Sequence, residues 1–154
     1  MPLHVDVVAA ERSILSEEAD EVLARTVQGQ IGILPHHAPL LTLLAPGEIC
    51  LRRGADEHLI AVSGGFLEVG HNRVTILADS AERAEEIDVA RAEEARRRAL
   101  DRLVTKSADL DLARAQASLA RSLARMRVAE HIRRRSGSQP RRSPEARPET
   151  PIGA

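Results

Sequence analysis

The sequence has almost no aromatic side chains: its 154 residues include one phenylalanine, no tyrosine and no tryptophan. A hydrophobic core must therefore be built from aliphatic side chains. Aromatic side chains usually provide the stacking on nucleic-acid bases, and this sequence has only one. We therefore expect no base-reading function.

Cysteine and long apolar runs are equally scarce. The one cysteine, Cys50, cannot form an internal disulfide or a multi-cysteine zinc site, which is typical of a reducing compartment. No apolar run approaches the roughly 20 residues that a membrane-spanning helix needs. Residues 1–6 also lack the basic and apolar regions of a secretory signal. We expect a chain that is neither secreted nor membrane-spanning.

The common signatures of catalysis are absent as well. The sequence has no glycine-rich loop ending in Gly-Lys-Ser/Thr, no Gly-x-Ser-x-Gly elbow and no His-Glu-x-x-His helix. His36 and His37 are adjacent, so a strand would point them to opposite faces and a turn would make them diverge, which argues against a shared metal ion. We predict that the chain is not an enzyme by itself, with no metal site and no required cofactor.

Charge divides the chain into an acidic front and a basic back. The net charge of -1 combines a charge of -8 in residues 1–87, +6 in residues 88–135 and +1 in residues 136–154. Such a split suggests modules with different partners.

The first part of the sequence has the pattern of an antiparallel β-sandwich. Short apolar stretches rich in Val and Ile alternate with period two and are broken by glycine and proline. Many short strands at this spacing predict a sandwich over residues 1–84. The expected strands are residues 3–9, 13–16, 21–27, 30–34, 40–44, 48–53, 58–61, 65–70 and 73–78.

After Ala81 the composition changes to Ala, Arg, Glu and Leu, without glycine or proline until Gly137, which predicts an antiparallel two-helix hairpin over residues 85–135. The first helix is expected over about residues 88–103, with Asp88 as its N-cap. A connector at 104–108 and a second helix over about 109–134 follow. The Arg/Pro/Ser-rich tail, residues 136–154, is too polar to pack and is expected to be disordered. The fold class is α+β in two parts.

Each expected helix has a narrow apolar stripe. On the first it comprises Val89, Ala92, the stem of Arg96, Ala99 or Leu100, and Leu103. On the second it comprises Leu112, Gln116, Leu119, Leu123, Met126 and either Ala129 or Glu130.

Polar side chains on the hairpin predict an anion site. Asp88, Arg91 and Arg98 share one face of the first helix, and Arg121 and Arg125 lie one turn apart on the second. An antiparallel hairpin brings these groups level with one another, and converging guanidinium groups are a common phosphate site. The alternative is a solvated surface on which the arginines pair with Glu93, Glu94 or Asp101.

Four segments carry a resemblance that covers about residues 3–133. They are residues 30–41 (QIGILPHHAPLL), 62–69 (VSGGFLEV), 74–79 (VTILAD) and the motif Ile87-Asp88-x-x-Arg91-Ala92. With these segments the sequence resembles the epsilon subunits of F-type ATP synthases. The resemblance implies a non-catalytic central-stalk subunit that couples proton translocation to ATP synthesis, at the cytoplasmic face of the bacterial plasma membrane as a peripheral part of the complex.

The resemblance also implies partners. The sandwich would bind the gamma subunit and touch the c-ring, the latter through the loop of Gln28, Gly29 and Gln30. The hairpin would inhibit ATP hydrolysis by contacting the beta and alpha subunits. Membrane contact would occur only through the complex, and no nucleic acid is expected.

A regulatory ATP site follows from the same resemblance. Ile87, Asp88, Arg91 and Ala92 match positions at the adenine end. Four further positions of the site are matched by Glu82, Arg98, Arg121 and Arg125. Unlike those relatives, this sequence has many alanines and no aromatic residue in either helix.

One competing hypothesis comes from the basic clusters. Residues 133–135 are all arginine, and Arg141 and Arg142 are adjacent, which would suit a nucleic-acid-associated protein. The acidic front and the missing aromatics argue against it.

Overall fold

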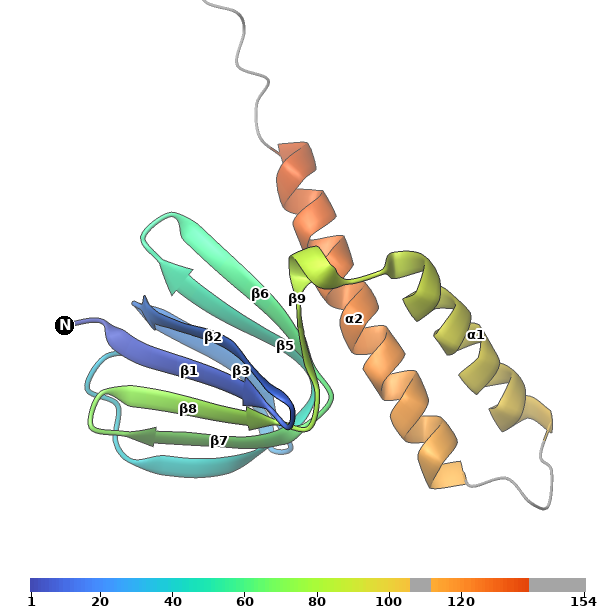
Figure 1. Cartoon of the computed structure of the whole chain (residues 1–154), viewed down its shortest axis with the longest axis horizontal. Helices are drawn as coiled ribbons and strands as arrows, with labels where there is room; N and C mark the ends of the chain where they lie inside the picture. Colours follow the sequence, from blue (N-terminus) through green and yellow to red (C-terminus); the bar gives the residue numbers. More distant parts are fainter. Residues whose placement is uncertain (106–111, 139–154) are drawn as a thin grey trace, which may run out of the picture.

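A computed structural model of the chain describes residues 1–105 and 112–138. It consists of a β-sandwich followed by two helices: α2 lies against one side of the sandwich, and α1 packs on the far side of α2 (Figure 1). Residues 106–111 and 139–154 lie outside the described residues. They include most of the predicted connector, the predicted start of the second helix and most of the predicted tail. The predicted α+β architecture is confirmed.

Nine strands form the sandwich. Their bounds are β1 Leu3–Ala9, β2 Arg12–Ala19, β3 Glu21–Thr26, β4 Gly29–Ile33, β5 Leu40–Arg53, β6 Asp56–Val62, β7 Gly65–Gly70, β8 Arg73–Ala78 and β9 Ala81–Arg83. The hydrogen-bonded order is β2-β1-β8-β7-β5-β3-β4, and β6 pairs with β5 and with β9.

Three details of the strand prediction were wrong. The segments 40–44 and 48–53 are one strand, β5, which pairs with β7 up to Leu44 and with β6 from Gly47 onward. Pro46 lies between these two ladders, so its missing N–H costs neither of them a bond. The short strand β9 was missed because three residues carry no periodicity. The sheet is also not wholly antiparallel, since β1 and β8 run parallel.

The change of partner along β5 makes it part of both layers of the sandwich. Aliphatic side chains from both layers fill the space between them. From β1, β7 and β8 these include Leu3, Val5, Val7, Leu67, Val69, Val74 and Ile76, and from β3, β5 and β6 they include Val22, Ile49, Leu51, Ile60 and Val62. One backbone position is restricted to glycine: Gly65 has φ +127°, and a Cβ there would collide with the Leu77 carbonyl oxygen.

The helical part begins with a short 3-10 turn, η1 Ala84–Glu86, and continues with α1 Val89–Thr105 and α2 Leu112–Ser138. Asp88 is the N-cap that the sequence predicted, because its Oδ1 accepts a hydrogen bond from the Arg91 backbone N–H at 3.1 Å. Both helices end later than expected: α1 extends into the predicted connector and α2 extends three residues into the predicted tail. Neither segment contains a proline, which would have ended a helix.

Small residues form the contact between the two helices. Ala92 and Ala99 on α1 and Ala115 and Ser122 on α2 are buried. Ala124 is buried as well, but it lies four residues before Val128, on the side of α2 that faces the sheet. The predicted stripes were therefore only partly right: Val89, Leu100 and Leu112 are exposed, and no large side chain of the α2 stripe is fully buried. Helices that approach closely bury the small residues and leave longer ones at the margin.

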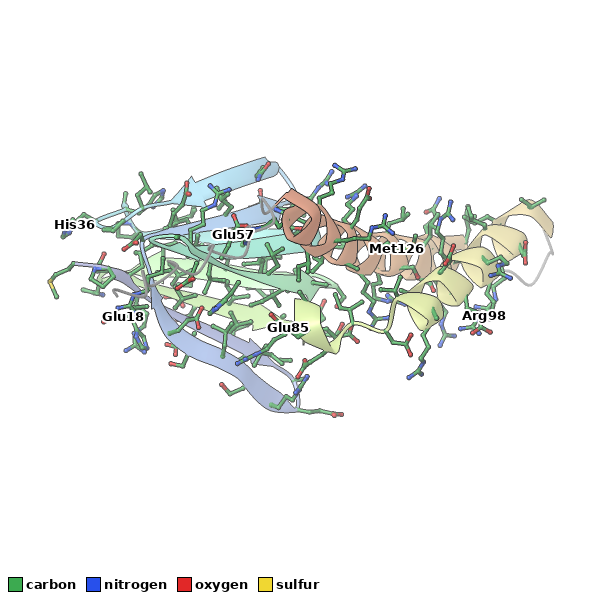
Figure 2. All side chains as sticks on the ribbon, turned by 90° about the horizontal axis from the view of Figure 1, so that it is seen from above. Glu18, His36, Glu57, Glu85, Arg98 and Met126 are labelled. Carbon is green, nitrogen blue, oxygen red and sulfur yellow. The ribbon has the colours of Figure 1, made fainter. Side chains whose placement is uncertain are left out.

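The hairpin contacts the sandwich through α2. Val128 is fully buried in a cluster with Cys50 and Leu59 on the outer face of β5 and β6, and Ile132 packs at its edge. Figure 2 shows Met126 of α2 and Arg98 of α1 on the hairpin side, with His36 at the opposite end of the sandwich. No helix among the described residues is long and apolar enough to cross a membrane.

Candidate functional site

A cleft of about 250 Å³ opens where the start of α1 meets the middle of α2. The sequence-predicted site is largely gathered here. The lining residues are Glu82, Glu86, Asp88, Arg91, Ala92, Ala95, Arg98 and Arg125. Six of them are among the eight residues expected to bind ATP.

The two remaining residues lie elsewhere. Ile87 packs against the cluster of Cys50, Leu59 and Val128 under α2, so its side chain supports the base of the hairpin. Arg121 lines a small adjoining depression with Ser63 and Ser80, and this depression shares Glu82 and Arg125 with the cleft.

The charged groups of the α1/α2 cleft are partly paired with one another. Arg125 Nε lies 2.8 Å from Glu82 Oε2, and each side chain is about one third exposed. Arg98 pairs with Glu94 at 3.0 Å on the solvent side, so the solvated-surface alternative accounts for Arg98. Among the described side chains, Arg91 has no ion pair. A ligand anion would therefore meet the guanidinium of Arg91, which has no ion pair among the described residues, and two guanidinium groups that carboxylates already hold.

Glu86 and Ala95 were missed as cleft residues. Glu86 is bonded to Arg12 at 3.0 Å, which lowers the pKa of its carboxyl group. Ala95 follows Ala92 by three residues on α1, so helical spacing could have identified it. Glu86 belongs to the η1 turn, which no periodic pattern indicates.

The predicted ring-facing loop is the turn between β3 and β4. Gln28, Gly29 and Gln30 are exposed there, and Thr26 holds the turn by donating from Oγ1 to the Gly29 carbonyl oxygen at 2.7 Å. Gly29 and Gln30 also form one edge of a second cleft, which lies between α2 and the sheet.

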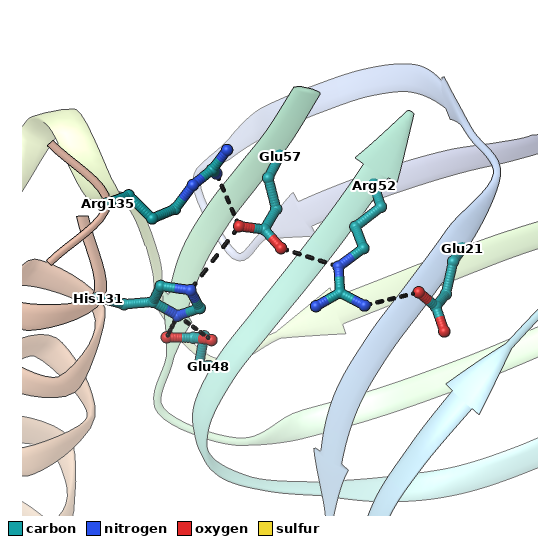
Figure 3. Close-up of polar contacts among 6 residues, drawn as sticks. All are labelled: Glu21, Glu48, Arg52, Glu57, His131 and Arg135. Atoms are coloured by element: carbon teal, nitrogen blue, oxygen red, sulfur yellow. Dashed lines mark hydrogen bonds and ion pairs between the residues drawn. The ribbon is translucent and has the colours of Figure 1, made fainter. Parts of the chain in front are cut away.

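A polar network that the sequence did not reveal ties α2 to the sheet (Figure 3). His131 Nδ1 lies 3.1 Å from Glu48 Oε1, and its Nε2 lies 3.7 Å from Glu57 Oε2. Arg135 binds the same Glu57 oxygen at 2.7 Å. Arg52 holds the other Glu57 oxygen at 2.8 Å.

This network affects two titratable groups. The Glu57 side chain is only 11% exposed, yet the hydrogen bond from Arg52 holds its pKa below the ordinary value. Burial, reinforced by Glu57, raises the pKa of the Cys50 thiol to about 12. Cys50 is therefore a protonated, unreactive thiol while the hairpin covers it.

The opposite outer face of the sandwich has no cover among the described residues. Leu43 on β5, Phe66 on β7 and Leu77 on β8 are neighbours in register, and all three are exposed. Leu41 extends the same face along β5, and Val27 lies beside Leu43 through a backbone hydrogen bond. We call this set, Val27, Leu41, Leu43, Phe66 and Leu77, the apolar row. Exposed apolar side chains that gather in this way mark interaction surfaces.

Comparison with known families matches the two parts of the chain separately. Residues 2–84 match the family described as ATP synthase, Delta/Epsilon chain, beta-sandwich domain. Residues 85–130 match the one described as ATP synthase, Delta/Epsilon chain, long alpha-helix domain.

Curated relatives match over most of their length. An ATP synthase epsilon chain of Dehalococcoides mccartyi is 52% identical over 133 residues, covering 86% of this chain and 95% of the relative. One of Herpetosiphon aurantiacus is 50% identical over 135 residues, covering 88% and 99%.

Solved structures with the same fold come from ATP synthases. A chain of the Euglena gracilis mitochondrial enzyme, solved as OSCP/F1/c-ring, matches with a TM-score of 0.68 and 26% identity, covering 85% of this chain and 81% of that one. A chain from the Tetrahymena thermophila central stalk and c-ring matches in fold, with a TM-score of 0.56 and 15% identity, covering 86% and 96%.

Proposed function

Because this chain belongs to the family of ATP synthase epsilon chains, we propose that its two parts divide the work of a central-stalk subunit between attachment and regulation. As a member of that family it is a non-catalytic subunit of the ATP synthase complex. The nucleic-acid alternative finds no support in these relatives.

Attachment is the task of the sandwich. The apolar row supports a contact with the gamma subunit, because a partner of similar apolar character would remove these side chains from water. The β3–β4 turn of Gln28, Gly29 and Gln30 contacts the c-ring. Through these contacts the chain is held at the cytoplasmic face of the bacterial plasma membrane and takes part in coupling proton translocation to ATP synthesis.

Regulation is the task of the hairpin. In the folded position it is held by Val128 and by the Glu57 network, and in an extended position it would reach the beta and alpha subunits and inhibit hydrolysis. Residues 112–135 carry seven arginines and one glutamate, Glu130, which suits an acidic surface on those subunits.

ATP is the regulatory ligand that stabilises the folded position. The observation that carries this proposal is the gathering of Asp88, Arg91 and Arg125 in one cleft between the two helices. At about 250 Å³ the cleft is smaller than typical ligand pockets of roughly 300–1,000 Å³. Part of a bound nucleotide would therefore extend beyond it, and Arg125 would exchange Glu82 for phosphate.

Calorimetric titration of the isolated chain with ATP tests this proposal. Saturable heat is expected for the wild type, with affinity reduced about tenfold or more in Arg91→Ala and in Arg125→Ala, since each removes a charge-assisted contact. Arg97→Ala is the matched control, because Arg97 is an exposed arginine of α1 that does not line the cleft. No heat in the wild type would end the ATP proposal and leave the family assignment untouched.

A further inference from the structure

The second cleft, between α2 and the sheet, has a volume of about 450 Å³, within the range of small-molecule sites. Its floor is apolar, formed by Leu23 and Cys50. Guanidinium groups surround this floor: Arg25 from β3, Arg52 from β5 and Arg127 from α2. The cleft thus combines an enclosed apolar base with positive charge from both of its walls.

Arg25 differs from every other arginine of the sandwich. Residues 1–87 carry six arginines and fourteen carboxylates. The other five arginines have partners: Arg12, Arg52, Arg53 and Arg73 bind carboxylates, and Arg83 donates to the Ile14 carbonyl oxygen. Among the described residues, Arg25 has no such partner. An arginine without a carboxylate partner in so acidic a domain can bind a ligand anion.

The position of Arg25 is set by its neighbour on β5. A Cβ at Gly47 would lie 3.0 Å from Arg25 Cδ and 3.1 Å from its Cβ, so the arginine stem lies directly over this glycine. A larger residue at position 47 would displace the stem. Because Gly47 has no side chain, the Arg25 stem can pack against its backbone beside the cleft.

Arg127 supplies charge from the opposite wall. It follows Arg125 by two residues, and two residues of α-helix turn by about 200°, so the two arginines point to opposite sides of α2. Arg125 lines the cleft with α1, whereas Arg127 lines the cleft with the sheet. Within the part of the chain that the structure describes, Arg127 forms no ion pair.

The remaining charges of the cleft are already committed. Glu48, the one carboxylate among its lining residues, is held by His131 at 3.1 Å. Arg52 is bound to Glu21 at 2.9 Å and to Glu57 at 2.8 Å. Two guanidinium groups without ion pairs among the described residues therefore face the space, and the one carboxylate that lines it is hydrogen-bonded to His131.

We propose that this cleft binds a small soluble phosphate compound, which bridges Arg25 on the sheet and Arg127 on α2. The site is distinct from the cleft between the helices and does not depend on it. Because one wall belongs to the sandwich and the other to the hairpin, the ligand binds only when the hairpin is folded. It therefore stabilises the folded position in proportion to its concentration.

Titration of the isotopically labelled full chain with pyrophosphate, followed by amide chemical shifts, tests the site at constant ionic strength. Saturable shifts are expected at Gly29, Gln30 and Arg127. Arg25→Gln and Arg127→Gln should each weaken binding about tenfold, the effect of losing one charge-assisted contact. Both side chains are exposed, so neither change should disturb folding.

Two controls define the alternatives. Arg97→Gln removes an exposed arginine outside the cleft, and Arg91→Gln removes one from the cleft between the helices. Both should leave pyrophosphate binding at the second cleft unchanged. Shifts that do not saturate, or equal weakening by Arg97→Gln, would mean general electrostatic attraction and would overturn the site. Shifts confined to residues 82–98 would assign the anion to the other cleft and would overturn it too.

Discussion

The two outer faces of the sandwich differ in what covers them, and the burial patterns along their strands differ accordingly. On β6, under α2, the consecutive residues from Leu59 to Val62 are all buried. On β7, across the sandwich, Phe66 and Glu68 are exposed while Leu67 and Val69 are buried. A strand covered on both sides loses its alternation, and a strand with one bare side keeps it.

The comparison shows that one outer face is covered by the chain's own hairpin, whereas the other is exposed. The covered face is closed by the chain itself, through Val128 and the Glu57 network. The bare face carries the apolar row, which we propose another subunit covers. In the proposed function, regulation therefore belongs to the face that the hairpin covers, and attachment belongs to the face that carries the apolar row.

Removing the cover entirely should have the largest effect. A complex whose epsilon chain lacks residues 88–154 is expected to lose inhibition of ATP hydrolysis while keeping most ATP synthesis. The main core of the sandwich contains no hairpin residue, so this part should stay folded. Rates of hydrolysis and of proton-driven synthesis in membranes are the measurement. A chain that lacks only residues 139–154 should behave like the full chain, and unchanged hydrolysis without the hairpin would refute the inhibitory role.

The next largest effect is expected from a charge placed between α2 and the sheet. Val128→Asp places an unpaired carboxylate in a fully buried position, at a cost of roughly 3 kcal/mol or more. The hairpin should therefore open about a hundredfold more often. Alkylation of Cys50, which lies beneath α2, measures the opening. Val104→Asp makes the same change at an exposed site and should alkylate as slowly as the wild type.

A charge on the bare face should leave folding intact and weaken attachment. Phe66→Glu is expected to reduce affinity for the gamma subunit about thirtyfold or more, as for a central aromatic contact. Binding of the isolated subunits to each other is the measurement. Leu112→Glu is the control, since Leu112 is 53% exposed and Phe66 is 50% exposed. Equal binding by both variants would mean that the apolar row is not the contact surface.

The smallest expected effect is a weakening of α2 docking at low pH. Arg52, the main cause of the lowered Glu57 pKa, belongs to the sheet, so docking of α2 adds only the part that comes from Arg135. That stabilising part is present above the ordinary glutamate pKa of about 4.3 and is lost as pH falls through the lowered value. Docking of α2, followed by the amide shifts of Val128 and Ile132, should therefore weaken below about pH 4.3.

Glu57→Gln separates this contribution from general acid effects. The variant should dock about 1–2 kcal/mol less firmly at neutral pH, since a hydrogen-bonded charge is lost, and should lose less than the wild type in acid. Glu68→Gln removes an exposed carboxylate from the bare face and should retain the wild-type pH dependence. Identical pH profiles for all three chains would exclude Glu57 as the acid-sensitive group.

Much of the fold could be predicted because it depends on local patterns. Alternation identified most strands, and the capping role of Asp88 followed from its place before the helix. The Pro46-Gly47 sequence is typical of a turn and predicted one. Strand β5 nevertheless continues through it, because its pairing partner changes there from β7 to β6. The α2 stripe failed for a related reason: the helix is contacted on two sides, which a single apolar stripe does not describe.

The candidate sites divide in the same way. Spacing within each helix and an antiparallel turn were enough to bring Asp88, Arg91 and Arg125 into one cleft. The contacts of His131 with Glu48 and Glu57 depend on where α2 rests on the sheet, and no spacing within one element contains that information. Arg25 and Arg127 are separated by about a hundred residues, so their shared cleft became visible only in three dimensions.

The continuous strand β5 gives the molecule a mechanical property. Leu43 on the bare face and Cys50 on the covered face belong to the same strand, seven residues or roughly 23 Å of extended chain apart. A pull exerted on the bare face therefore travels along one covalent backbone to the floor beneath the hairpin. Because β5 pairs with β7 in one layer and with β6 in the other, the two layers cannot slide past each other under torque without stretching that backbone. In the proposed function, this strand mechanically connects the face that binds other subunits to the face that the hairpin covers.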